Sequence, residues 1–255
     1  MKDVSTNISK WLKDYLKNSE TKCFVIGVSG GIDSAVSSTL CAETGAKTYV
    51  INIPIRSKQE NTDLSQLHCD WLCQKYSNVE QVYIDATSAY QEFENIFKET
   101  KEYNLLANAN SKSRMRMMIL YYLATSKHGL VVGTGNKVED FGVGFYTKYG
   151  DGGVDISPIA DLTKSQVNKI AHLLDIKEEI LSAPPTDGLW EDSRTDESQI
   201  GASYEELEWA MSYLENSRQS SKKLTTRQNK VLEIYLSFNN KNKHKMVEIP
   251  VYKLR

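Results

Sequence analysis

Four short apolar segments alternate with helix-like stretches through the first half of this chain, and this alternation constrains the fold more than any other feature. The segments start at Cys23, Thr48, Val79 and Gly129, and each has the length and the β-branched content of a buried strand. The helix-like stretches cover residues 34–43, 59–76, 87–99 and 112–128. Strands that alternate with helices form a parallel sheet covered on both faces. We therefore predict an α/β fold with a doubly wound parallel sheet flanked by helices.

The composition is that of a globular protein and argues against several classes of partner. Of the 255 residues, 40% are hydrophobic and 25% are charged. Lys and Arg number 31 against 33 Asp and Glu, so the chain lacks the basic excess of duplex nucleic-acid binders. No apolar run approaches the roughly 20 residues of a membrane helix, and the first residues lack the apolar core of a signal peptide. We expect a cytoplasmic protein that binds neither nucleic acid nor membrane.

The cysteines allow one metal-site hypothesis. Cys69 and Cys73, with His68 beside them, are one helical turn apart and would suit a metal. Because no second pair of ligands is in sight, we interpret them as reduced structural thiols in a helix.

The second half of the chain opens on a Gly-rich stretch, GNKVEDFGVGFYTKYGDGGVDISP, which is too long for an ordinary connection and which we interpret as a functional loop. A capping box at Thr163 and Gln166 then predicts a helix with Lys164 in its first turn. The polar, acidic segment 182–203 fits either a mobile flap or a solvated linker. Two further helices, YEELEWAMSYLE and LTTRQNKVLEIYLSF, are expected before a basic tail.

The sharpest motif is SGGIDS, residues 29–34, which follows the first apolar segment and opens a helix. Paired glycines let the backbone turn tightly and approach a ligand, and the N–H groups of a helix N-terminus attract anions. Ser-Gly-Gly alone would also fit an ordinary turn, whereas strand, full motif and helix together indicate a phosphate site. The loop lacks the lysine of a Walker A motif, and its acid, Asp33, suggests Mg²⁺ bound with the phosphate.

This loop resembles the pyrophosphate loop of the N-type ATP pyrophosphatases, which cleave ATP between its α- and β-phosphates and activate a substrate as an adenylate. Four further motifs in chain order resemble the ammonia-dependent NAD synthetases of that superfamily: SKSRMRM, VVGTGNKVED, FYTKYGDGGVDISPIADLTKSQV and APPTDGLWEDSRTDESQIGASYEELE. The resemblance runs from about residue 8 to residue 245. It implies a Rossmann-like sheet of the adenine nucleotide alpha hydrolase type, in a single domain over residues 1–255 with a flap at 183–202.

The resemblance implies a reaction as well as a fold. The expected activity is ATP-dependent amidation of nicotinic acid adenine dinucleotide (deamido-NAD) to NAD, the last step of NAD biosynthesis. The reaction would pass through an acyl-adenylate and release AMP and pyrophosphate. Glutamine-using relatives carry an additional amidase domain, and the synthetase motifs fill the 255 residues, so free ammonia is the expected nitrogen donor.

Site residues follow from the resemblance by motif position. The triphosphate of ATP is assigned to Gly27, Val28, Ser29, Gly30, Gly31, Ile32, Asp33 and Ser34, with Thr134, Lys164 and Thr186 completing the ATP site. Deamido-NAD is assigned to Arg114, Lys148, Asp155, His244 and Lys245. Mg²⁺, the implied metal cofactor, is assigned to Asp33 and Glu139.

The expected chemistry explains why these residue types are needed. As the nicotinate carboxylate attacks the α-phosphorus of ATP, Lys164, Mg²⁺ and the loop amides would neutralise the charge on the phosphoryl oxygens. Lys148 would draw the two anionic substrates together and steady the acyl-adenylate. Ammonium must then bind and lose a proton, a task suited to a carboxylate. We assign that catalytic role to Asp151, with Asp155 as the alternative; an ordinary Asp-Gly turn is the competing interpretation of Asp151.

Two positions depart from the family pattern. The stretch between Glu139 and TKYGDGG holds one residue more than usual, which makes Asp140 a rival metal ligand. Asn52 stands where an Arg often precedes the family's Leu-Pro, and Arg56 is a candidate to replace that charge.

Two structural alternatives also stay open. The resemblance implies a homodimer with a shared dinucleotide site, and the stripe of Met115, Met118, Ile119 and Tyr122 would suit either that interface or an ordinary buried face. Trp190 would be either the apolar anchor of the flap or a fixed core contact.

Two rival functions are weighed against this interpretation. A tRNA-thiolating member of the superfamily would need a basic RNA surface and a catalytic cysteine pair, and the sequence contains neither. A nucleotide-binding module without catalysis would not need Asp33, Lys148, Lys164 and Thr186 together in one chain.

Overall fold

A parallel sheet forms the centre of the computed structural model, which describes residues 1–186, 188–190, 194–216 and 223–254. Within these residues the sheet has four strands: β1 (Cys23–Gly27), β2 (Lys47–Asn52), β3 (Val79–Tyr83) and β4 (Gly129–Val132). Their order is β3-β2-β1-β4, and every neighbouring pair is parallel. The predicted α/β class and the four predicted strands are confirmed.

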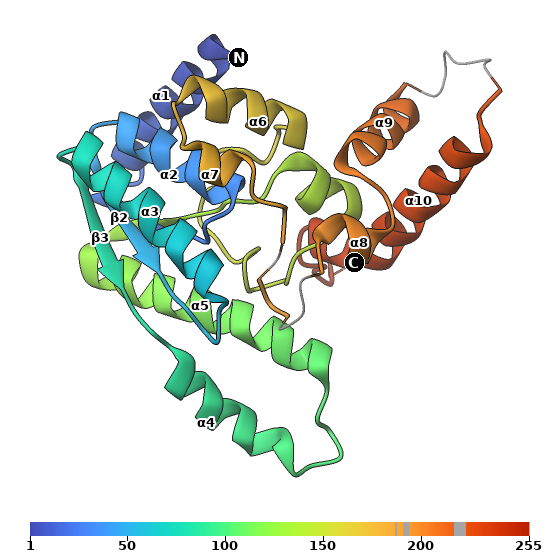
Figure 1. Cartoon of the computed structure of the whole chain (residues 1–255), viewed down its shortest axis with the longest axis horizontal. Coiled ribbons are helices and arrows are strands. Elements are labelled where there is room, and N and C mark those ends of the chain that lie inside the picture. Colours follow the sequence, from blue (N-terminus) through green and yellow to red (C-terminus); the bar gives the residue numbers. More distant parts are fainter. Residues whose placement is uncertain (187, 191–193, 217–222, 255) are drawn as a thin grey trace.

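Helices cover both faces of the sheet and extend to one side of it (Figure 1). They are α1 (Lys2–Asn18), α2 (Ile32–Glu43), α3 (Gln59–Lys75), α4 (Thr87–Lys98), α5 (Leu105–Lys127), α6 (Lys164–Leu173), α7 (Glu178–Leu181), α8 (Asp196–Ile200), α9 (Tyr204–Glu215) and α10 (Thr226–Met246). A π-helix, η1 (Val138–Val143), lies between β4 and α6. The helix predicted from residue 112 begins earlier, at Leu105, because the side chain of Asn104 caps it by accepting from Ala107 N at 3.0 Å.

Three cores hold these layers together. Successive residues of a strand face opposite sides of the sheet, so Ile26 packs with side chains of α2, α3 and α6, whereas Val25 packs with those of α4 and α5. A third core joins η1 to α9 and α10 through residues such as Val138 and Leu207. Residues from all three cores line the cavity described below, so its walls are fixed by packing.

The helices in the described part of the chain include none that combines the length and the apolar character needed to cross a bilayer.

Candidate active site

The strand order creates a crevice at the carboxyl ends of β1 and β4. The chain adds β2 and β3 on one side of β1 and then returns to add β4 on the other side. Ligands of open α/β sheets bind at such a reversal, outside the carboxyl ends of the strands. A cavity of about 1330 Å³ opens here, lined by the loop after β1, the end of β2, parts of α5, η1, α6 and α10, and part of the segment before α8.

The loop of residues 29–34 has the conformation that the sequence predicts. Gly30 adopts a φ of +89°, and a Cβ atom there would lie 2.8 Å from the carbonyl oxygen of Asn61, so only glycine fits. Ser34 Oγ accepts from Ser29 N at 3.2 Å and donates to Gly31 O at 2.9 Å, which closes the turn at the start of α2. The first N–H groups of α2 have no partner inside the helix and face the region where an anion is favoured.

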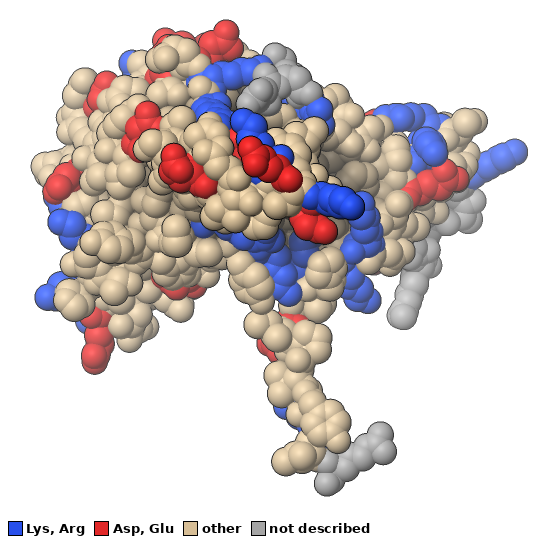
Figure 2. Space-filling view, turned by 90° about the horizontal axis from the view of Figure 1, so that it is seen from below, with Lys and Arg blue, Asp and Glu red and all other residues tan. Residues whose placement is uncertain are grey.

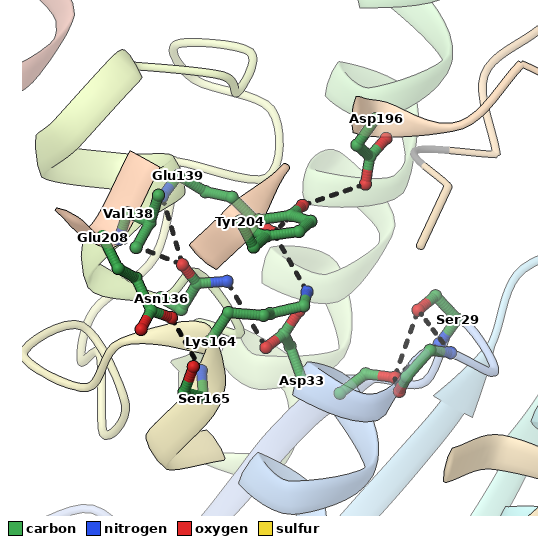
Figure 3. A network of polar contacts seen from close by, with 12 residues as sticks. Ser29, Asp33, Asn136, Val138, Glu139, Lys164, Ser165, Asp196, Tyr204 and Glu208 are labelled. Atoms are coloured by element: carbon green, nitrogen blue, oxygen red, sulfur yellow. Dashed lines mark hydrogen bonds and ion pairs between the residues drawn. The ribbon is translucent and has the colours of Figure 1, made fainter. Parts of the chain in front are cut away.

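A buried ion cluster lies next to this loop (Figure 3). Lys164, in the first turn of α6, has its ammonium group on Asp33 Oδ2 and 3.1 Å from Glu139 Oε1. The capping box predicted at Thr163 is confirmed: Gln166 Oε1 accepts from Thr163 N at 2.9 Å, and this fixes the start of α6. The structure therefore brings together three residues that were assigned to ATP and Mg²⁺ from different parts of the sequence.

The charges of this cluster shift its titration. Burial raises the pKa of Asp33 to about 6, against the opposing charge of Lys164. Burial also disfavours ionisation of Glu139, but the charge of Lys164 and the hydrogen bond from Tyr204 outweigh it and lower its pKa. Burial alone would lower the pKa of Lys164, whereas the two carboxylates raise it. When both acids are ionised, one ammonium faces two carboxylates, and the site favours a further cation.

Three residues without an assigned role complete the cluster. Tyr204 donates its hydroxyl to Glu139 Oε1 at 2.5 Å and to Asp196 Oδ2 at 3.3 Å. Asn136 donates to Asp33 Oδ1 at 3.4 Å, and its own Oδ1 accepts from the backbone N–H of Glu139 at 3.1 Å. Asn136 and Tyr204 lie inside motifs that carry the family resemblance, GTGNK and GASYEELE, and those motifs were the only sequence signal for them.

Asp140 and Glu139 occupy different surroundings. Glu139 contacts Lys164, whereas the carboxylate of Asp140 packs over Gly135, where an added Cβ atom would lie 2.1 Å from Asp140 Oδ2. Burial and the charges of Glu139, Asp151 and Asp33 raise the pKa of Asp140 to about 8. The geometry thus favours Glu139 over Asp140 as the partner of Asp33.

The GDGG loop forms part of the wall of the same cavity. Asp151 Oδ1 accepts from Ser113 Oγ at 2.6 Å and from Thr147 N at 3.0 Å, and these bonds fix one oxygen of the carboxylate. The protein atoms around the carboxylate group partly desolvate it and raise its pKa, and the two hydrogen bonds limit the rise. Lys148 donates to His244 O at 2.8 Å, and Arg114 donates to Lys148 O at 3.3 Å.

The remaining predicted residues divide between the cavity and other surfaces. Thr134, Thr186, Arg114, Lys148, His244 and Lys245 line the cavity with the loop of residues 27–34. Asp155 is not among the described lining residues; its carboxylate accepts from Val131 N at 2.7 Å and from the Tyr121 hydroxyl at 2.9 Å.

Figure 2 shows Lys and Arg side chains gathered around the middle of the face seen from below, a charge pattern suited to anionic substrates.

Arg56 and Arg116 differ in their positions relative to the cavity. Arg56 Nη1 lies 3.0 Å from Glu94 Oε2, and Arg56 is not among the described lining residues. Arg116, which lines the cavity from α5, donates to Ile53 O at 3.1 Å at the end of β2. The structure therefore places the guanidinium of Arg116, and not that of Arg56, at the cavity beside the end of β2.

The predicted flap is described only in part, since residues 187 and 191–193 lie outside the described residues. Pro185 O accepts from Asp196 N at 3.1 Å, and Lys112 donates to Leu189 O at 3.1 Å. Trp190 is half-buried, lines the cavity and stacks under the guanidinium of Arg194, whose Cζ lies 4.3 Å from the ring centroid.

The apolar stripe of α5 is divided between core and surface. Met115 and Ile119 pack against the core that joins the sheet to α4 and α5, whereas Met118 and Tyr122 are 60% and 76% exposed. The stripe is thus partly a buried face and partly an uncovered surface.

The Cys69–Cys73 hypothesis gains no support. Cys69 is buried and Cys73 is exposed. In the described part of the chain, no group of three or more His, Cys, Asp or Glu side chains is arranged to hold a metal ion.

A phosphate-type loop at the reversal of a parallel sheet, beside a buried lysine and two acids, defines a nucleotide-binding α/β protein of the Rossmann-like adenine nucleotide alpha hydrolase type. The family model described as NAD synthase matches residues 4–248, and the chain belongs to that family.

Individual relatives agree with this assignment. The chain is 33% identical over 219 residues to the NH(3)-dependent NAD(+) synthetase of Methanocaldococcus jannaschii, covering 86% of this chain and 83% of the relative. Among solved structures it is similar to NMN synthetase from Francisella tularensis, with a TM-score of 0.87 and 31% identity over 99% of this chain and 98% of the other. It is also similar to the NH3-dependent NAD synthetase of Campylobacter jejuni, with a TM-score of 0.79 and 25% identity over 99% of each chain.

Proposed function

We propose that this chain uses ATP and free ammonia to convert deamido-NAD to NAD through an acyl-adenylate, with release of AMP and pyrophosphate. One observation carries the proposal: a single cavity contains the loop of residues 29–34, the Lys164 cluster and the GDGG loop. The first could bind phosphates, the second could stabilise charge on them, and the third offers a carboxylate for ammonium. The ammonia-dependent relatives support the choice of nitrogen donor.

The adenylation step relies on the loop and on Lys164. In the proposed mechanism the triphosphate of ATP lies along residues 27–34, with Thr134 and Thr186 at its edges. Lys164, held in place by its two carboxylate partners beside the loop, donates to the phosphoryl oxygens as the nicotinate carboxylate attacks and pyrophosphate leaves. An ammonium preorganised in this way stabilises the developing negative charge most effectively in a site that excludes water.

The pair of Asp33 and Glu139 suits Mg²⁺. Mg²⁺ is held in nucleotide sites by one or two carboxylates together with substrate phosphates, and these two acids face the same ammonium beside the phosphate loop. Bound there, Mg²⁺ would offset charge on the phosphates. Tyr204 and Asn136 orient the two carboxylates, and Asp140, packed over Gly135, stays outside the pair.

The amidation step is assigned to Asp151. Its Oδ1 is held by two hydrogen bonds, which leaves Oδ2 available to accept a proton from ammonium. A raised pKa makes a carboxylate a stronger base, and burial raises that of Asp151. Asp155, already bonded to Val131 and Tyr121 outside the cavity lining, is the weaker candidate for this role.

The second substrate is assigned to the basic side of the cavity. Arg114, Lys148, His244 and Lys245 line that side, and we propose that they bind the anionic part of the nicotinate nucleotide. Asp155 does not line this cavity among the described residues, so it would contact the substrate only if the site is shared with a second copy of the chain.

A second candidate substrate is nicotinic acid mononucleotide, which the same chemistry would convert to NMN. The observation that favours it is the close match in fold and length to NMN synthetase from Francisella tularensis. The reacting nicotinate group is the same in both cases, so the loop of residues 29–34, Lys164 and Asp151 would keep their roles.

The organisation of the enzyme forms a further part of the proposal. We propose a homodimer in which the exposed residues Met118 and Tyr122 of α5 are covered by a second copy. We also propose a cytoplasmic location, one synthetase domain over residues 1–255, and closure of the segment 183–202 over the cavity with Trp190 as its apolar contact.

A direct comparison of substrates tests the proposal. The protein is incubated with ATP, Mg²⁺ and ammonium, and kcat/KM is measured separately for deamido-NAD and for nicotinic acid mononucleotide. A higher value for deamido-NAD supports the first candidate, and a higher value for the mononucleotide replaces it with the second. The absence of product from both would refute the proposed amidation.

A further inference from the structure

Three side chains on one face of α10 bind three successive carbonyl groups at the end of η1. Asn239 donates to Gly142 O at 2.8 Å, and Asn242 donates to Val143 O at 2.8 Å. Lys245 donates to the next carbonyl, that of Gly144. The three donors are three residues apart, the spacing that places side chains on one helix face.

These carbonyls need partners because η1 ends there. The last carbonyl groups of a helix have no N–H donor inside that helix. Gly144, with a φ of +63°, turns the chain away from the axis of η1, so the helix does not continue to supply donors. Phe145 N donates back to Glu139 O at 2.9 Å, which leaves the later carbonyls to other donors. Helix α10 supplies those donors from about 100 residues further along the chain.

Two glycines, one in η1 and one directly after it, allow α10 to come this close. A Cβ atom on Gly144 would lie 2.5 Å from Asn242 Cβ, and one on Gly142 would lie 3.4 Å from Tyr235 Cε2, also on α10. The backbone of the loop therefore packs directly on the helix, and the short asparagine side chains reach its carbonyls.

The π-helix carries one residue of the ion cluster. A π-helix closes its hydrogen bonds over five residues instead of four, so its register differs from that of an α-helical turn. Glu139 lies near its start, bonded to Lys164. The register of η1 thus bears directly on where the Glu139 side chain lies.

We propose that Asn239 and Asn242 are positioning residues that hold η1 in its π-helical register and thereby keep Glu139 on Lys164. The inference deepens the proposed function and rests on it for its kinetic consequence. Without the two donors, the carbonyls of Gly142 and Val143 lose their partners, and the turn is free to shift by a residue. Displacement of catalytic groups by about 1 Å can cost about 100-fold in rate.

A matched set of variants tests the inference. Asn239→Asp and Asn242→Asp keep the side-chain shape but remove the N–H donor. Asn240→Asp is the control, because Asn240 is exposed on the same helix and the described chain gives its side chain no hydrogen bond. Asn239→Ala, Asn242→Ala and Asn240→Ala repeat the comparison without added charge, in case the acidic variants fold poorly.

Each variant is assayed for kcat, for KM of ATP and for Mg²⁺ dependence at a temperature well below its own Tm. We expect kcat of the Asn239 and Asn242 variants to fall about 10- to 100-fold, with a higher Mg²⁺ requirement, while the Asn240 variants match the wild type. A lower Tm with unchanged kcat would show that the asparagines only stabilise the fold, and would overturn the inference.

Hydrogen exchange separates this inference from the proposed function. Amide exchange at Gly144 and Phe145 should be faster in the Asn239 and Asn242 variants and unchanged in the Asn240 variants. Unchanged exchange in all variants would contradict anchoring by α10, whatever the enzyme's activity. If the wild type amidates no nicotinate nucleotide, the proposed function fails while this comparison still decides whether α10 holds η1.

Discussion

The substitution Asp151→Asn separates the two halves of the proposed reaction. Asparagine has the shape of aspartate and keeps an Oδ1 atom that can accept from Ser113 Oγ and Thr147 N, now 2.6 and 3.0 Å from the carboxylate. A neutral acceptor makes each bond weaker by about 1 kcal/mol, and both bonds are kept, so the loop should stay folded. The amide nitrogen that replaces Oδ2 cannot accept a proton. Adenylation, which needs no base, should therefore continue while transfer to ammonia fails.

Rapid-quench measurements of pyrophosphate and NAD provide the assay. We expect a pyrophosphate burst of one equivalent per site and an NAD rate about 10² to 10⁴ lower, the usual loss when general-base help is removed. Higher pH supplies more neutral ammonia and should partly restore NAD formation. Ser113→Ala is the control, since it keeps the carboxylate and removes one of its bonds, and it should show no such rescue. Burst and NAD falling together in Asp151→Asn, without rescue at high pH, would refute the assignment.

Three further variants test the cluster around Lys164 and the neighbouring carboxylate of Asp140. Asp33→Asn should abolish turnover at ordinary Mg²⁺, because an amide is a poor ligand for a hard cation; near-normal activity would contradict its role as a metal ligand. Tyr204→Phe removes the hydroxyl bond to Glu139 and should lower kcat about tenfold; a steady-state kcat within twofold of wild type would exclude this contribution. The pKa of Asp140 is raised from 3.8 to about 8, so the folded chain holds the carboxyl proton of Asp140 more tightly than the unfolded chain does. The free energy of unfolding should therefore fall as pH rises from 3.8 to about 8. Asp140→Asn should then raise Tm by a few degrees at pH 8 and less at pH 5, as measured by calorimetry. An equal change in Tm at pH 8 and pH 5 would contradict the raised pKa of Asp140.

The centre of the sheet could be predicted because β1 is buried on both faces. Such a strand is a continuous apolar run that needs no tertiary context to be found. The edge strand β3 is only partly buried, so its expected burial is not met although its position is. Helix α1 was not predicted, although Val4, Ile8, Leu12 and Leu16 recur at the spacing of one helix face and pack together against the core. Ser9 is buried only because its hydroxyl bonds Leu40 O on α2 at 3.2 Å, a partner that no local pattern reveals.

The site could be predicted where it is local in sequence. The loop of residues 29–34 and the capping box before Lys164 are each contained in a few consecutive residues. The hydroxyl of Tyr204 on Glu139 joins residues 65 positions apart, and its place in the site depends on how α9 packs beside η1. A π-helical turn has no simple periodic signature, so η1 was not predicted.

Adenylation of nicotinate leaves a characteristic set of products, which one reaction can reveal. The protein is mixed with ATP, Mg²⁺, ammonium and deamido-NAD, and the nucleotides and phosphates are separated and quantified. We expect NAD, AMP and pyrophosphate in equal amounts. ADP and orthophosphate in place of AMP and pyrophosphate would contradict adenylation.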